Sequence, residues 1–188
     1  MLSSLTRGIV LAALAGGLLG ACDDPNVLAD ATVPNVIDTV SLYAYEGTPV
    51  NTPSGYSIID ARAVRIDQRP DFDFAFNLGP GDVPWLLPPA ALGVAQNLSL
   101  EPGMLEPAAD FDDLTIAQLN GYRWADTLAV SVGQTWVARS RIACSIGVPL
   151  YAKLRILSVD PAARTLTFEV LANRNCGYRG LQPGLPDS

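Results

Sequence analysis

The hydrophobic pattern of the chain changes near residue 35. From there, short runs rich in valine, isoleucine, threonine and aromatic residues alternate with clusters of glycine, proline and aspartate. Such runs favour β-strands, and such clusters favour turns. Several short strands separated by turns indicate an all-β fold, mainly antiparallel, that forms a sandwich or a barrel-like domain over residues 35–188. We predict strands over residues 36–45, 56–66, 72–78, 127–132, 135–142, 150–159 and 165–172.

The clearest strand pair is LYAKLRILSV followed by TLTFEVLA. In the first run, apolar residues at positions 150, 152, 154 and 156 alternate with Tyr151, Lys153 and Arg155. One face of this strand is therefore apolar and the other amphipathic. Asp160 and Pro161 open a short connection with good turn chemistry, so we predict an antiparallel hairpin.

Residues 79–122 differ from the rest of the chain because they are rich in proline and show no sustained strand pattern. A connection of this length is too long for a simple turn. We predict an ordered excursion over one face of the domain, held to the core by residues 85–87, with short helices over 89–95 and 113–119. The acidic group at residues 110–113 is expected to cap the second helix. The alternative is that the excursion forms a binding surface.

The N-terminal segment contains the longest apolar run of the chain. Residues 8–21 carry no charge and follow Arg7, and the run is too short to span a bilayer but suits a signal peptide. Its last residues, Leu19-Gly20-Ala21-Cys22, resemble the bacterial lipobox, in which the cysteine is lipidated and becomes the first residue. We therefore predict a signal peptide over 1–21, a lipid on Cys22 and a polar tether over 22–34. An ordinary secretory signal is the alternative, and the choice of membrane and leaflet stays open.

The chain has three cysteines. If Cys22 carries lipid, Cys144 and Cys176 remain as a pair in an exported, oxidising setting, and we predict a disulfide between them. Two buried free thiols or a metal pair are the alternatives. Two isolated cysteines without histidine make a poor zinc site.

The charge and the absence of histidine exclude several classes of function. The chain has 19 acidic residues against 12 Lys and Arg, which argues against nucleic-acid binding through a basic patch. The lack of histidine removes Ser-His-Asp and Cys-His catalysis, as well as histidine-ligated zinc and haem. Only carboxylate, Ser-Lys or tyrosine chemistry would remain, and we expect neither an enzyme nor a resident metal or cofactor.

Acidic and aromatic residues alternate in RPDFDFAFN. A strand here would place Phe72, Phe74 and Phe76 on one face, where we expect them to join the core. Asp71, Asp73 and Asn77 would then lie on the other face. Calcium is an alternative interpretation of these oxygens, although no EF-hand loop surrounds them.

Lys153 is the only lysine of the chain. A partly desolvated amine beside a serine such as Ser140 or Ser158 could act as a base or nucleophile. We predict instead that Lys153 forms a cross-strand ion pair with Glu169.

Three stretches show a family resemblance. Phe72-Asp73-Phe74-Ala75-Phe76 is similar to the W-D-L-A-F stretch of HmuY-type haemophore lipoproteins. The run from Gln134 to Ser140, followed by Tyr151-Ala152-Lys153-Leu154-Arg155-Ile156, resembles the strand and the Y-A-K-L-R-I run of that family. The resemblance implies an all-β fold and a carrier of a small ligand. The haem ligands of the family are histidines, which this chain lacks, so Met104 and the tyrosines are the remaining candidates for iron ligands.

Two functional hypotheses follow. The first is a lipoprotein of the bacterial cell envelope, held to a membrane through Cys22, that acts as a binding or structural interaction module for an unidentified partner. The second is a small-ligand carrier without histidine ligands. In a carrier, aromatic residues would line a groove, whereas in a module they would pack in the core or on the sheet surface. The residues concerned are Trp124, Trp136, Tyr151 and Tyr178.

Overall fold

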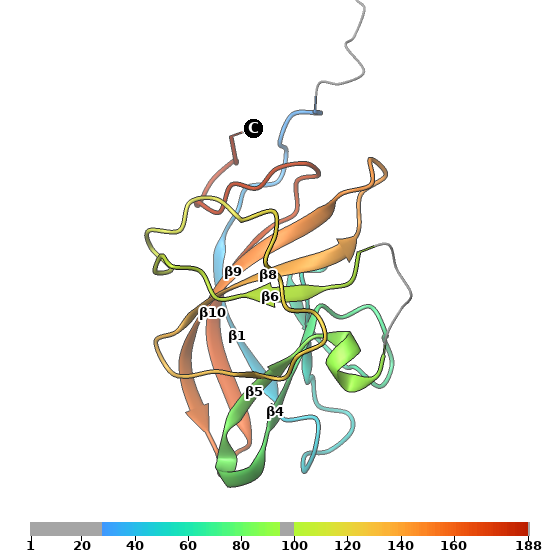
Figure 1. Cartoon of the computed structure of the whole chain (residues 1–188), viewed down its shortest axis with the longest axis vertical. Coiled ribbons are helices and arrows are strands. Elements are labelled where there is room, and N and C mark those ends of the chain that lie inside the picture. The colour runs from blue at the N-terminus through green and yellow to red at the C-terminus, as the bar shows by residue number, and fades with distance from the viewer. Residues whose placement is uncertain (1–27, 95–99, 188) are drawn as a thin grey trace, which may run out of the picture.

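The computed structural model describes residues 28–94 and 100–187. Its strands form two separate five-stranded sheets that make a sandwich (Figure 1). Neighbouring strands pair antiparallel throughout these sheets. The predicted all-β, mainly antiparallel fold is thereby confirmed in its sandwich form.

The first sheet has the order β1-β10-β9-β8-β6. In that order its strands are Ile37–Tyr43, Thr165–Asn173, Pro149–Asp160, Thr135–Ile142 and Gly103–Leu105. The second sheet has the order β3-β2-β4-β5-β7. Its strands are Arg62–Val64, Gly55–Ser57, Phe74–Leu78, Pro84–Leu87 and Leu128–Ala129. Two short 3₁₀ helices, η1 (Pro80–Asp82) and η2 (Pro89–Leu92), flank β5.

The β9–β10 hairpin is present as predicted. Its register pairs Asp160 with Thr165. The side-chain Oδ1 of Asp160 accepts hydrogen bonds from the backbone N–H groups of Ala162 and Ala163, both at 2.9 Å. An aspartate that binds the backbone two and three residues ahead closes a turn, which is why the chain reverses here.

Two predicted strands are shorter in the structure. The segment 56–66 is a hairpin of β2 and β3, because the chain turns where Ala61 N–H donates to Ile58 O at 3.2 Å. The segment 127–132 contracts to the two residues of β7.

The excursion over residues 79–122 also differs from the prediction. It contributes two short strands, β5 and β6, although its sequence shows no sustained strand pattern. The first predicted helix is reduced to η2. No helix forms over 113–119, because the backbone N–H groups of Asp113 and Leu114 both bind Asp110 O and close a single turn. Asp110 therefore acts through its carbonyl in a turn and caps no helix.

Aromatic side chains from both sheets fill the main core. Tyr56 and Phe74 of the second sheet stack with ring centroids 5.4 Å apart. Phe168 of β10 meets both rings, at 5.7 Å and 5.8 Å. Trp136 and Leu86 are also buried in this cluster, so residue 86 anchors β5 to the core as predicted.

A second core lies on the outer face of the first sheet. Val137, Tyr151 and Leu171 point outward from β8, β9 and β10, yet they are buried. Phe111 and Leu114 of the excursion cover them. The face of β9 that the sequence marked as amphipathic is thus an internal surface, and both faces of the sheet are packed.

Candidate functional site

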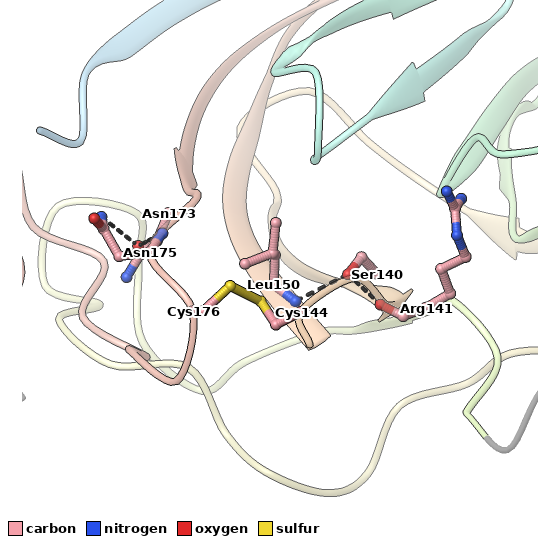
Figure 2. Close-up of a disulfide and its surroundings, with 7 residues drawn as sticks. All are labelled: Ser140, Arg141, Cys144, Leu150, Asn173, Asn175 and Cys176. Atoms are coloured by element: carbon pink, nitrogen blue, oxygen red, sulfur yellow. Dashed lines mark hydrogen bonds between the residues drawn. A yellow bond between two sulfur atoms is a disulfide. The ribbon is translucent and has the colours of Figure 1, made fainter. Parts of the chain in front are cut away.

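One end of the sandwich, which we call the disulfide end, holds the predicted cysteine pair. Cys144 follows β8 and Cys176 follows β10, and their sulfur atoms lie 2.12 Å apart with Cα atoms at 5.7 Å. The prediction that these two strand ends lie on the same side of the sheet is confirmed. The disulfide therefore joins the β8–β9 turn to the C-terminal segment (Figure 2).

Ser140 supports the β8 side of this end. The β8–β9 register shifts between Arg139 and Ile142, which interrupts the regular ladder of hydrogen bonds. The hydroxyl of Ser140 accepts a hydrogen bond from Leu150 N–H at 2.9 Å and donates to Arg141 O at 2.6 Å (Figure 2). The side chain thus satisfies the backbone where the bulge leaves it without a ladder partner.

Buried asparagines tie the N-terminal segment to the C-terminal segment. Asn175 Oδ1 accepts hydrogen bonds from the N–H groups of Thr32 and Val33, each at 3.0 Å, and its Nδ2 donates to Val33 O at 2.7 Å. Asn173 Oδ1 in turn accepts from the backbone N–H and the Nδ2 of Asn175 (Figure 2). The chain is therefore fixed where it joins the domain.

Asn35 completes the attachment. Its Nδ2 donates to Gly180 O and Gln182 O at 3.1 Å, and its backbone pairs with Gly184. The sequence analysis did not single out these asparagines, because their partners at the two ends of the domain are more than 140 residues apart in the sequence. The available signal was the spacing of Asn173 and Asn175 directly before Cys176, since asparagine is depleted in strands.

The contacts of the domain extend upstream of Asn35. The hydroxyl of Tyr178 donates to Ala29 O at 3.1 Å. Leu28 packs against Gly177, which has a φ of +86° and would bring a Cβ within 2.4 Å of the Leu28 side chain. The last part of the predicted tether is therefore docked, and the predicted lipidation residue, Cys22, lies outside the described residues.

Lys153 is buried beneath the excursion. Its ammonium donates to Phe111 O at 2.6 Å and to Leu114 O at 2.9 Å, and it lies 4.5 Å from the centroid of the Phe111 ring. Burial lowers the pKa of Lys153 from its ordinary value. Glu169 pairs with Arg155, so the predicted Lys153–Glu169 pair is wrong.

The hydrogen bonds of Lys153 give it a structural role and no serine partner. A Ser-Lys pair is not formed with Ser140, whose hydroxyl is engaged by Leu150 and Arg141. Ser158 lies farther along β9, opposite Thr167. A charge-assisted donor that binds two carbonyls holds the excursion onto the sheet.

Replacement of Lys153 by methionine tests this contact. We expect Lys153→Met to lower the free energy of unfolding by about 2 kcal/mol, because the carbonyls of Phe111 and Leu114 lose a charged donor in a buried place. Hydrogen exchange should quicken over residues 106–123. Arg155→Met is the comparison on the same strand, since it removes two partly exposed ion pairs, with Glu169 and with Asp112 of the excursion, and should cost less than Lys153→Met. Rapid acylation of Lys153 by an amine-reactive reagent in the native protein would contradict its burial.

The oxygens proposed for calcium point to different partners. Asp71 pairs with Arg69 at 2.6 Å, Asn77 Nδ2 donates to Glu46 at 2.9 Å, and Asp73 Oδ2 accepts from Ile58 N–H at 2.6 Å. Within residues 28–94 and 100–187, no group of three or more metal-binding side chains is present. These three side chains therefore bind separate protein partners and do not converge on one another.

The predicted aromatic groove does not form either. Trp136 is in the main core, Tyr151 is in the second core, and Trp124 is exposed. Tyr178 is buried against the N-terminal segment. Four hollows at the surface of the described part, with volumes of about 200 to 490 Å³, are lined by other residues.

Comparison of the chain with protein-family models, with curated proteins and with solved structures gave no match. The resemblance to HmuY-type lipoproteins therefore stays a prediction. Among the residues that the structure describes, no helix is long and apolar enough to cross a membrane.

Proposed function

We propose that the protein is a lipoprotein of the bacterial cell envelope, held outside the cytoplasm by a lipid on Cys22. In this proposal the β-sandwich is a binding or structural interaction module that does not catalyse a reaction. The lipobox-like Leu19-Gly20-Ala21-Cys22 is the observation that carries the proposal. Acyl chains on one cysteine hold a protein firmly when two or more are present, because each buried CH₂ contributes about 0.8 kcal/mol.

The attachment of the N-terminal segment supports this role. Thr32 and Val33 are bound by Asn175, and Asn35 is bound by the carbonyls of Gly180 and Gln182. A force on an anchored N-terminus would reach the sandwich through these buried hydrogen bonds and through the disulfide end. Such a junction suits a domain that is displayed from a membrane.

The packing of the core favours the interaction module over the small-ligand carrier. The rings of Tyr56, Phe74 and Phe168 contact one another across the sheets, and Trp136 is buried beside them. Ligand carriers keep a largely enclosed apolar pocket, whereas this inter-sheet space holds large side chains. The HmuY-like stretches are part of this packing, since Phe74 and Phe76 are core residues.

Replacement of the lipidated residue tests the proposal. We expect the wild-type protein in the membrane fraction with an acylated Cys22 at its mature N-terminus, detected by mass spectrometry. Cys22→Ser should lose the acyl groups, because serine offers no thiol for the thioether. Globomycin should cause the uncut wild-type precursor to accumulate. An unmodified Cys22 in mature wild-type protein would contradict the proposal.

A further inference from the structure

Exposed aliphatic side chains lie at both ends of the sandwich, for example Val50, Val132 and Leu157 at the end opposite the disulfide. Those at the disulfide end are the ones near the N-terminal segment. We call Val36, Ile116, Ile146 and Leu185 the aliphatic rim, and each of them is at least half exposed. They come from segments far apart in the sequence, and of these the N-terminal and C-terminal segments lie together at the top of Figure 1. A surface leucine or isoleucine by itself is ordinary, so the choice of this end as a contact surface depends on its distance from Cys22.

Hydrogen bonds and the disulfide bring the members of the rim together. Val36 and Leu185 follow the paired residues Asn35 and Gly184. Ile116 pairs with Gly180 and lines the same shallow groove, of about 490 Å³, as Leu185. Ile146 lies in the β8–β9 turn, two residues after the disulfide-bonded Cys144.

The length of chain before the structure limits where this end can lie. Leu28, which packs at the disulfide end, is six residues after Cys22. Six residues span at most about 20 Å when fully extended. A lipid on Cys22 therefore keeps the disulfide end within about 20 Å of the bilayer surface. The opposite end is about 40 Å farther away, because the 12 residues of β9 run between the two ends at about 3.3 Å each.

We propose that the aliphatic rim rests on the interfacial region of the lipid bilayer to which Cys22 is attached. This inference rests on the proposed lipidation. The short linker raises the effective concentration of the rim at the surface, so weak insertion of a few aliphatic side chains suffices. Arg179 and Asp187 both line the groove beside Ile116 and Leu185, so opposite charges are present there and the contact is apolar in origin. We expect it on zwitterionic and anionic membranes alike.

Two labelled variants of the lipidated protein test the orientation. Leu185 and Val50 are similarly exposed, at 59% and 72%, but Val50 lies in the loop after β1 at the opposite end. Leu185→Cys and Val50→Cys would each carry the environment-sensitive dye NBD on the only free thiol, because Cys22 is acylated and Cys144 is bonded to Cys176. Ile116→Cys provides a second position on the rim if the first variant folds poorly.

The proteins are reconstituted into phosphatidylcholine vesicles, with and without phosphatidylglycerol. The proposal predicts a blue shift of the dye on the rim and quenching by spin-labelled lipid, with no change for the dye at position 50. If the protein floats with the vesicles and the rim dye behaves as in water, or if both positions respond equally, the rim proposal is overturned while lipidation stands. If the protein does not float with the vesicles, both lipidation and the rim proposal fail.

Discussion

Removal of the disulfide should lower the free energy of unfolding by about 4 kcal/mol at 25 °C. The bond between Cys144 and Cys176 closes a loop with a sequence separation of 32 residues, and the chain-entropy model gives about that value for such a loop. In the double variant Cys144→Ala/Cys176→Ala, the unfolded chain would regain the conformational entropy that the disulfide removes. For a domain of this size, the melting temperature should fall by about 10 °C.

The site of the bond makes part of the effect local. Cys176 lies next to Asn175, which binds Thr32 and Val33. Loss of the bond should therefore quicken hydrogen exchange in the N-terminal segment as well as in the β8–β9 turn. A reductant serves as the matched control, because it should bring the wild-type protein to the stability of the double variant and leave that variant unchanged. If the wild-type protein and the double variant are equally stable without reductant, the bond contributes nothing to stability.

The strand pattern was sufficient to predict the fold class and the β9–β10 hairpin because their signals are local. Alternation of apolar residues along β9 and the turn chemistry of Asp160 act within a few positions of each other. The disulfide was predicted by counting cysteines once Cys22 was assigned to lipid. None of these three predictions depends on how distant segments of the chain pack against each other.

The excursion was harder to predict because its structure depends on the sheet below it. β6 exists through its pairing with β8, and Met104 also pairs with Arg123 on its other side. The sequence placed Lys153 on the amphipathic face of β9, because the alternation of residues shows only that the two faces of the strand differ. Over residues 150–154 neither face of β9 is exposed to solvent, since residues 111–114 cover the second one. Tertiary packing here overrode the local pattern.

The environment of Asp73 leads to a prediction about pH. This residue lies directly before β4, is buried, and has one oxygen bound to Ile58 N–H at 2.6 Å. Burial raises the pKa of Asp73 to about 7, and the nearby charge of Arg141 only partly opposes this effect. Between about pH 4 and pH 7, the folded protein therefore holds a proton that the unfolded chain has released.

Because the native state binds the extra proton, stability must fall as the pH rises through this window. Each pH unit within it corresponds to about 1.4 kcal/mol, so Asp73 should make the protein about 3 kcal/mol less stable at pH 8 than at pH 5. Asp73→Asn removes the titrating group while its amide oxygen can still accept from Ile58. Urea unfolding at the two pH values should show this loss in the wild-type protein and a correspondingly smaller loss in the variant.

Asp71 is the matched control because its pKa moves in the opposite direction. Its hydrogen bond with Arg69 lowers the pKa of this carboxyl, so its contribution to stability is lost as the pH falls. Asp71→Asn should therefore lower stability at pH 8 and keep most of the loss between pH 5 and pH 8, because the charge of Asp71 is only a minor cause of the raised pKa of Asp73. If Asp73→Asn keeps the full wild-type difference between pH 5 and pH 8, the carboxyl of Asp73 ionises at its ordinary pKa and its burial has no titration consequence.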